Sequence, residues 1–282
     1  MSTASILLLG AIAGLTIFLG LPVGRMRNLS PGVRVFLNAA ATGVLLFLFW
    51  DVLTLAMGNV EPRMTAANDG HASWGPFAGF AALFAGGLIV GLMSLVYYDS
   101  WMRRRLRPQG PGAASVSELA PVPVRGLRLH SEPRRLAFLI AVGIGLHNFA
   151  EGLAIGQAAA SKEISLAVLL IIGFGLHNAT EGFGIVGPLA AEAERPSWPF
   201  LILLGLIGGG PTFVGTVVGQ AWVSDALATV FLTLAAGSIL YVVIAMLGVC
   251  AKSGRRELMM WGILLGAIVG FATDLVVTAA GA

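Results

Sequence analysis

Residues 164–191 read ISLAVLLIIGFGLHNATEGFGIVGPLAA and carry a single formal charge, on Glu181. An α-helix needs about 20 mostly apolar residues to cross the hydrocarbon core of a bilayer, so this stretch is long enough. The whole chain has a similar composition, because 57% of its 282 residues are hydrophobic and only 11% are charged. A soluble protein carries about 25% charged residues. The composition therefore predicts an integral membrane protein and excludes a disordered chain or, with Cys250 as the only cysteine, a disulfide scaffold.

Eight apolar stretches of this kind follow one another along the chain. The predicted fold class is an all-α integral membrane protein in which residues 1–282 form one polytopic transmembrane domain. Residues 99–135 are the only long connection and are expected to be a flexible cytoplasmic connection between the third and fourth helices. Asp99 is interpreted as an interfacial residue at the end of the third helix. The eight transmembrane helices are predicted at residues 4–22, 35–57, 76–98, 136–159, 164–188, 198–221, 226–250 and 258–279.

The basic residues predict the orientation of these helices. Fifteen of the 17 Lys and Arg residues lie in the odd-numbered connections. Cytoplasmic connections of membrane proteins carry the excess of Lys and Arg, so the odd-numbered connections are expected in the cytoplasm and both termini outside. The basic charge follows a membrane pattern and gives no reason to expect a nucleic-acid partner.

A ten-residue pattern occurs twice, in the predicted fourth and fifth helices. Residues 143–152 read GIGLHNFAEG and residues 173–182 read GFGLHNATEG. Both copies lie near the middle of their helices, and consecutive spans are antiparallel. Equivalent positions of two antiparallel spans lie at the same depth in the membrane only near the middle of each span. The two copies can therefore face each other at the bilayer midplane.

Each copy carries a His and a Glu four residues apart, which places both side chains on one helix face with Cβ atoms roughly 5–6 Å apart. Zinc binds imidazole nitrogen and carboxylate oxygen at about 2.0–2.2 Å. Two facing copies would therefore supply four ligands of the N2O2 type. These are His147, Glu151, His177 and Glu181. Asn148 and Asn178 lie about 100° further round their helices and can offer amide oxygens to the same cation or to an adjacent position.

The spans contain no basic residue that could pair with the two glutamates. A charged side chain at the centre of a transmembrane helix costs about 2.5–3.5 kcal/mol, and no Lys or Arg lies within any of the eight predicted helices. Glu151 and Glu181 must therefore be protonated, hydrated in a cavity or compensated by a cation. One divalent ion would balance both, and imidazole with carboxylate favours Zn²⁺, Fe²⁺ or Mn²⁺ over Mg²⁺ and Ca²⁺.

Three other features of the spans bear on a cation pathway. Asp51, at the end of the apolar stretch of the second helix, is either an auxiliary ligand or pathway residue, or a hydrated residue at a helix end. Asp274, in the outer part of the last helix, favours the hydrated interpretation. The run GGGP at 208–211 is expected to break the sixth helix and to free backbone carbonyls that could line a cavity.

The tandem H-N-x-x-E-G motifs on the fourth and fifth of eight predicted helices, with outward termini and a basic third connection, resemble the ZIP family of zinc and iron permeases. The segment AAGSILYV at 235–242 is similar to the seventh-helix signature of that family. The resemblance implies a homodimer of the cell membrane, with eight helices in each protomer, that moves divalent metal ions towards the cytoplasm. It also implies a transport site formed by His147, Asn148, Glu151, His177, Asn178 and Glu181.

The chain departs from the family pattern in the sixth helix. Family members often carry a Glu there in a G-x-x-E-P-like context, where GGGPTFVG at 208–215 offers Thr212. Without that Glu, a second divalent ion would have one carboxylate ligand fewer. Only the negative charges of Glu151 and Glu181 would then balance the charges of two ions. One strong metal site is therefore expected, with Thr212 as an auxiliary residue, rather than a binuclear site.

The main hypothesis from the sequence is a secondary transporter that carries a divalent cation, above all Zn²⁺, through the lipid bilayer by alternating access. The metal is its substrate, with Fe²⁺, Mn²⁺ and Cd²⁺ as alternatives, and no cofactor is expected. The chain has no G-x-x-x-x-G-K-[ST] motif for ATP hydrolysis. A membrane metalloenzyme, such as a hydrolase or oxygenase, would use the same ligands but needs an open coordination position and a general base. An uncoupled cation channel is a third hypothesis.

Overall fold

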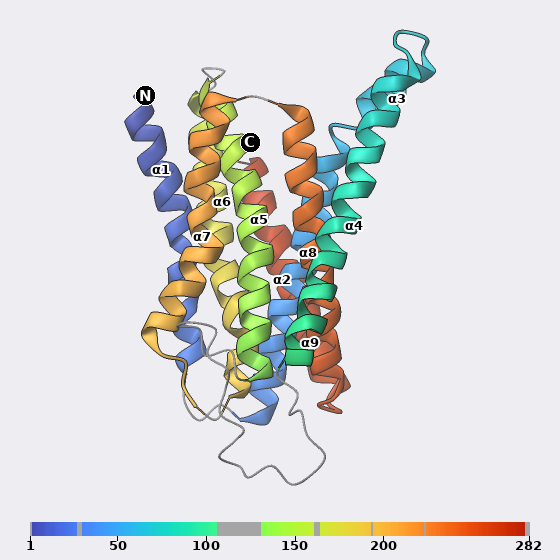
Figure 1. Ribbon diagram of the computed structural model, residues 1–282. Coiled ribbons are helices and arrows are strands. Elements are labelled where there is room, and N and C mark those ends of the chain that lie inside the picture. Colours follow the sequence, from blue (N-terminus) through green and yellow to red (C-terminus); the bar gives the residue numbers. More distant parts are fainter. Residues whose placement is uncertain are drawn as a thin grey trace.

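The computed structural model describes residues 2–26, 30–105, 131–160, 164–192, 194–222 and 224–279, and every element in these ranges is helical. The long helices run along one elongated bundle (Figure 1). They are α1 (Thr3–Leu15), α2 (Pro31–Met57), α4 (Trp74–Arg105), α5 (Glu132–Ala160), α6 (Ile164–Val186), α7 (Trp198–Ala221), α8 (Asp225–Ala251) and α9 (Arg256–Ala279). The start of α1 and the end of α9 lie at one end of the bundle, and the end of α4 and the start of α5 lie at the other (Figure 1).

Seven helical segments among the described residues are long and apolar enough to cross a membrane. α6 has 23 residues, but several of its side chains lie outside the described part of the chain. Large apolar side chains such as Leu8, Ile202 and Leu264 are exposed on the outside of the bundle, where lipid rather than water would contact them. The protein is therefore an all-helical, multi-pass membrane protein. The seven segments are Thr3–Arg25, Pro31–Asn68, Trp74–Trp101, Glu132–Ala160, Trp198–Ala221, Asp225–Ala251 and Arg256–Leu275.

The predicted helix boundaries agree closely with the structure in the second half of the chain. Helices were expected at 198–221 and 226–250, and α7 and α8 span Trp198–Ala221 and Asp225–Ala251. Local capping explains the agreement, because the side chains of Ser197 and Ser224 accept hydrogen bonds from backbone N–H groups three residues further on. A serine before an apolar run is a helix start that can be read from the sequence.

The first half of the chain differs from the prediction in two places. α1 ends at Leu15 and the chain continues as the 3₁₀ turns η1 (Thr16–Leu19) and η2 (Leu21–Arg25), rather than as one helix over 4–22. The hydroxyl of Thr16 donates a hydrogen bond of 2.7 Å to the Ala13 carbonyl, and Pro22 has no N–H with which to continue an α-helix. The short helix α3 (Glu61–Asn68) in the second connection was not predicted.

The run GGGP at 208–211 does not break α7, so the predicted break is wrong. α7 is one helix with Pro211 inside it. The glycines let neighbouring helices pack directly on this part of α7: a Cβ atom at Gly209 would collide with the Gly14 carbonyl of α1, and one at Gly145 of α5 would collide with the Ile207 carbonyl. These contacts hold the helix together where the proline removes one hydrogen bond.

The third span is longer than predicted, and this changes the interpretation of Asp99. α4 continues to Arg105 and α5 begins at Glu132, so helices cover both ends of the range 99–135, whereas residues 106–130 lie outside the described residues. Asp99 is buried, and its Oδ1 atom lies 2.7 Å from Nε of Arg135 on α5. The interpretation of Asp99 as the end of the third helix is therefore wrong, because α4 continues for six more residues, to Arg105.

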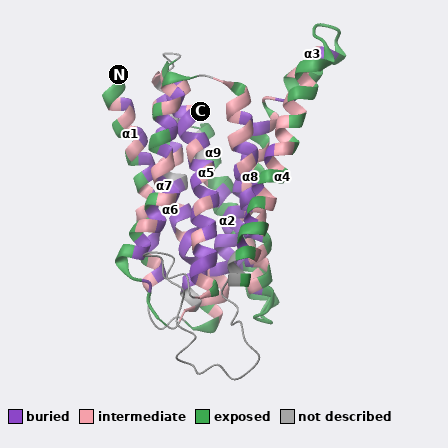
Figure 2. Ribbon diagram, viewed as in Figure 1, coloured by how far each residue is buried: buried purple, intermediate pink, exposed green. Residues whose placement is uncertain are grey.

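The long helices pack in two groups. In the first, which we call the α5 group, α5, α6, α7 and α1 pack mainly on one another. In the second, which we call the α2 group, α2 packs on α8 and α9, and α4 packs on α8. α5 is the most buried of the seven spans, with 72% of its most apolar stretch buried against 17% in α4, and it runs through the centre of the bundle in Figure 2.

Glycines bring helix backbones into direct contact within each group. A Cβ atom at Gly152 or Gly215 would collide with backbone atoms across the α5–α7 pair, and one at Gly43 or Gly266 across the α2–α9 pair. Wherever a described glycine approaches the backbone of another helix this closely, both helices belong to the same group. Between the groups, by contrast, the described glycines make only ordinary van der Waals contacts with the other backbone, as Gly143 of α5 does with Ser238 of α8. Each group therefore packs as a close unit around its glycine contacts, while α5 also packs on α8 across the boundary.

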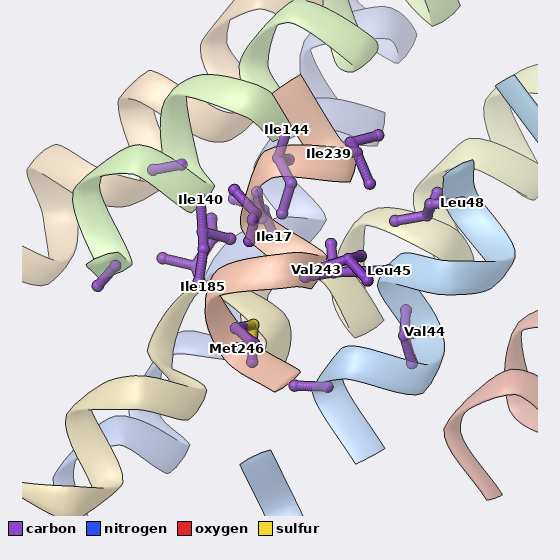
Figure 3. Packing of buried hydrophobic residues seen from close by; sticks show 14 of the residues in the cluster. Ile17, Val44, Leu45, Leu48, Ile140, Ile144, Ile185, Ile239, Val243 and Met246 are labelled. Carbon is purple, nitrogen blue, oxygen red and sulfur yellow. The ribbon is translucent and has the colours of Figure 1, made fainter. Parts of the chain in front are cut away.

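An apolar layer fills this boundary (Figure 3). Ile144 of α5 and Ile185 of α6 belong to the same buried cluster as Met246 of α8. α2 completes the layer from the other side. The residues labelled in Figure 3 are Ile17, Val44, Leu45, Leu48, Ile140, Ile144, Ile185, Ile239, Val243 and Met246.

The glycine contacts predict how α7 responds to an added methyl group. Gly215→Ala should destabilise the protein by about 1–3 kcal/mol, because the new Cβ forces α5 and α7 apart at the Phe149 carbonyl. Gly210→Ala is the matched control on the same helix, since nothing lies within 4 Å of its Cβ position. Thermal unfolding of the detergent-solubilised variants measures both effects. Equal melting temperatures for the two variants would contradict the close contact.

Candidate metal centre

α5 and α6 contact each other through the two copies of the repeated motif. Nε2 of His147 lies 3.1 Å from Oε1 of Glu151, one turn further along α5, and 3.7 Å from Oε1 of Glu181 on α6. His147 and Glu181 are fully buried, and Glu151 is 3% exposed. The structure thus brings an imidazole and both carboxylates together in the middle of the bundle, which is the arrangement that the repeat predicts.

Asn148 links this cluster to α7. Its Nδ2 atom donates one hydrogen bond of 3.0 Å to Oε2 of Glu181 and another of 3.0 Å to the carbonyl of Gly208. Gly208 opens the GGGP run, so this run does supply a backbone carbonyl to the site, although the helix is intact. Oδ1 of Asn148 is buried and has no hydrogen-bond partner among the described residues, which leaves one oxygen of this side chain available to a ligand.

Asn178 and Thr212 are directed towards α1. Nδ2 of Asn178 donates a hydrogen bond of 3.0 Å to the Ala13 carbonyl. The Thr212 hydroxyl lies beside the next residue of α1, because a Cβ atom at Gly14 would be 3.1 Å from Oγ1. Oδ1 of Asn178 and Oγ1 of Thr212 are both buried, and neither has a hydrogen-bond partner in the described part of the chain. These two residues therefore lie beside one turn of α1, at which the α-helix gives way to η1.

The remaining predicted ligand, His177, lies on α6, but its side chain is outside the described residues. Among the described side chains, no group of three His, Cys, Asp or Glu residues is arranged to hold a metal ion. The spacing still suits a metal. A tetrahedral zinc with bonds of about 2.0–2.2 Å holds its ligand atoms roughly 3.4 Å apart, and the two nitrogen–oxygen distances are 3.1 and 3.7 Å.

Acidic side chains continue from the cluster towards the end of the bundle where the chain termini lie. The Asp51 carboxylate of α2 interacts electrostatically with His147 and Glu151, and Asp274 of α9 interacts in turn with Asp51. Asp51 is half-buried and Asp274 is exposed. Asp51 therefore lies between the exposed Asp274 and the buried carboxylates of the cluster.

The opposite side of the cluster is closed by apolar side chains. Ile144 lies one turn before His147 on α5, and Ile185 lies one turn after Glu181 on the antiparallel α6. Both are buried in the layer between the two helix groups. The polar cluster therefore communicates with acidic groups at one end of the bundle and meets an apolar barrier at the other.

Sequence reasoning missed the backbone carbonyl of Ala13, and also the ion pairs at the start of α5. Besides the pair of Arg135 with Asp99, Nε of Arg134 lies 2.9 Å from Oε2 of Glu192, and both side chains are largely buried. Two arginines directly before an apolar run could have indicated ion pairing at a helix end. No pattern in the sequence, however, identifies which acidic residue each arginine meets.

The bonds of Asn148 predict a stability difference in metal-free protein. Asn148→Ala removes the amide that contacts both Glu181 and Gly208 in a buried site, so we expect a loss of about 1–3 kcal/mol. Asn59→Ala is the control, because Asn59 donates a single bond of 3.1 Å to Thr229 in a partly exposed position, and it should lose less. Thermal unfolding in the presence of a chelator measures both variants. An equal loss of stability in the two variants would mean that the hydrogen bonds of Asn148 contribute no more to stability than the single bond of Asn59.

A comparison with known protein families places this arrangement in context. The family described as ZIP zinc transporter matches residues 125–273, which is 149 of the 282 residues and includes both motifs and the whole of α5, α6, α7 and α8. The search of curated proteins found no match to this chain. ZIP proteins are transporters of divalent metals and not enzymes, so the metal is a substrate and the metalloenzyme hypothesis is excluded. Because the match covers more than half of the chain, this protein belongs to the ZIP zinc transporter family.

Proposed function

We propose that this protein carries Zn²⁺ into the cytoplasm and that the ion binds between α5 and α6. The observation that supports this most strongly is the burial of two carboxylates, on Glu151 and Glu181, within 3.7 Å of one imidazole nitrogen of His147. Neither apolar stretch, 136–161 nor 164–191, contains a Lys or Arg. A divalent cation from outside the chain is the counter-charge that satisfies both carboxylates at once.

The proposed ligand set combines the contacting residues with their neighbours in the two motifs. Imidazole nitrogen and carboxylate oxygen in a compact arrangement favour Zn²⁺, with Fe²⁺, Mn²⁺ and Cd²⁺ as further substrates. The amide oxygen of Asn148, which has no hydrogen-bond partner among the described residues, is a further ligand, and Thr212 is an auxiliary residue beside α1. The transport-site residues are His147, Asn148, Glu151, His177, Asn178 and Glu181.

We propose eight membrane spans, namely the seven apolar segments described above and α6. Its 23 residues are enough to cross the hydrocarbon core. The arginine-rich ends of α4 and α5 lie at the end of the bundle opposite to the termini, so that end is assigned to the cytoplasm and the termini to the outside of the cell membrane. Asp51 then lies on the outer side of the metal centre, where its charge attracts cations towards the site.

Alternating access is proposed to result from movement of the α5 group against the α2 group. Close glycine contacts lie within each group, whereas side chains fill the boundary between them, so sliding along this boundary disrupts the fewest backbone contacts. Ile144, Ile185 and Met246 close the boundary on the cytoplasmic side of the metal centre. In this proposal, the cytoplasmic side is the closed one, and metal release requires the two groups to separate there.

A homodimer is part of the proposal. The family resemblance implies one, and α4 is the least buried of the seven spans. Ile89 and Val90 of α4 are 60% and 55% exposed. A second copy of the chain that covers this face would reduce the apolar surface area that each protomer exposes to lipid.

Replacement of one carboxylate tests the transport site. Glu151→Gln in protein reconstituted into liposomes should reduce Zn²⁺ uptake by about tenfold or more, because it removes a ligand and half of the negative charge. Glu61→Gln is the control, since Glu61 is exposed on α3 and should not affect uptake. Uptake at the wild-type rate in Glu151→Gln would reject the site. Competition of Zn²⁺ uptake by Fe²⁺, Mn²⁺ and Cd²⁺ ranks the substrates.

A reversible cross-link tests the movement of the two groups. A Cβ atom at Gly187, after α6, would lie 3.2 Å from Cβ of Ala41 on α2, close to the separation of about 3.5–4.5 Å in a disulfide. Oxidation of an Ala41→Cys, Gly187→Cys double variant in a Cys250→Ser background should stop uptake, and reduction should restore it. The two single-cysteine variants, treated identically, are the controls. Undiminished uptake by the oxidised, cross-linked protein would exclude this movement.

A further inference from the structure

A second polar cluster lies at the cytoplasmic end of the bundle, beyond the apolar layer. A cavity of about 160 Å³ opens there between the two helix groups. The α2 group lines it with Asn38 and Cys250, and the α5 group lines it with Glu132 and with Gly187 of the 3₁₀ turn η4 (Gly187–Ala191). No residue of the proposed transport site lines this cavity, so its polar groups need a separate explanation.

Asn38 and Cys250 contact each other directly in the wall of the cavity. Nδ2 of Asn38 lies 3.3 Å from Sγ of Cys250, and the two residues are 6% and 3% exposed. Oδ1 of Asn38 is buried and has no hydrogen-bond partner among the described residues. A buried amide oxygen is normally satisfied by a hydrogen bond or by a ligand, so this unpaired atom indicates that something binds beside the thiol.

The cluster lies on the route that a metal would take out of the transport site. Cys250 is one turn beyond Met246 on α8, and Met246 belongs to the apolar layer. On the opposite side, a Cβ atom at Gly187 would lie 3.3 Å from Oδ1 of Asn38, and Gly187 follows Glu181 by less than two helical turns. An ion that leaves Glu181 past Ile185 therefore meets Asn38 and Cys250 next.

The donor atoms suit a soft divalent cation. Zinc binds thiolate sulfur at about 2.3 Å and oxygen at about 2.0–2.2 Å, so sulfur and oxygen ligands of one tetrahedral ion lie roughly 3.6 Å apart. The nitrogen and oxygen of an amide have nearly the same shape, and a half-turn of the Asn38 amide would place Oδ1 where Nδ2 now lies, 3.3 Å from Sγ. Binding replaces the thiol proton: Cys–SH and M²⁺ give Cys–S–M⁺ and H⁺.

We infer that Cys250 and Asn38 form a second metal site, at which the ion pauses in the cytoplasmic exit of the transport route. One sulfur and one amide oxygen make this a weaker site than the buried cluster of His147 and two carboxylates, as an exit site requires. Glu132 and Arg34 also line the cavity. The position of this site on the route rests on the proposed function, but metal binding by the thiol does not.

Cys250 is the only cysteine of the chain, so thiol signals from the purified full-length protein report on this site alone. Titration with Cd²⁺ should produce the ultraviolet absorption band of a cadmium thiolate and should slow alkylation of Cys250 by N-ethylmaleimide. Asn38→Leu, which keeps the size of the side chain but removes the oxygen, should weaken the apparent Cd²⁺ affinity by about tenfold. Asn59→Leu is the matched control and should bind Cd²⁺ like the wild type.

Two further measurements separate this inference from the proposed function. Glu151→Gln should keep both the cadmium thiolate band and the protection from alkylation, while its uptake falls. If uptake by Glu151→Gln does not fall, the proposed transport site fails but the Cys250 site remains. Absence of the band in wild-type protein at saturating Cd²⁺, or an unchanged affinity in folded Asn38→Leu, would overturn the inference and leave Cys250 as a packing residue.

Discussion

The structure depends on keeping two carboxylates in the middle of an apolar bundle. Glu151 and Glu181 are buried, and the apolar stretches 136–161 and 164–191 that carry them contain no Lys or Arg. His147 and Asn148 provide the polar contacts that make this burial tolerable, and α7 holds Asn148 in place through one backbone carbonyl. The negative charge of the two carboxylates favours the binding of a divalent cation inside the bundle.

The packing of the helices connects this electrostatic requirement to movement. Glycines allow α5 and α7 to meet backbone to backbone, so the α5 group carries the metal centre as one unit. The boundary with the α2 group is different in character, since it contains apolar side chains, the ion pair of Arg135 with Asp99 and the cavity beside Cys250. Backbone-to-backbone packing within groups and side-chain packing between them would let one group move against the other and expose one site to two sides of a membrane.

Much of the fold could be predicted from the sequence because a bilayer limits the choices. An apolar run must be a helix, since lipid satisfies no backbone hydrogen bond, and a capping serine such as Ser197 marks where it starts. The errors occurred where neighbouring helices decide the outcome. Pro211 does not break α7 because α1 and α5 pack against it, and Asp99 is buried where it pairs with Arg135 at the start of α5. Such contacts join residues that are far apart in the chain.

The sequence by itself determined that His147 and Glu151 share a helix face, because four residues make about one turn of any α-helix. Only the tertiary structure decided that Glu181 approaches His147, that Asn148 bonds to the Gly208 carbonyl and that Asn178 turns instead to α1. These contacts depend on the rotation of each helix and on the distance between helix axes. Both are set by how glycines and side chains from distant parts of the chain fit together, which no local spacing of residues specifies.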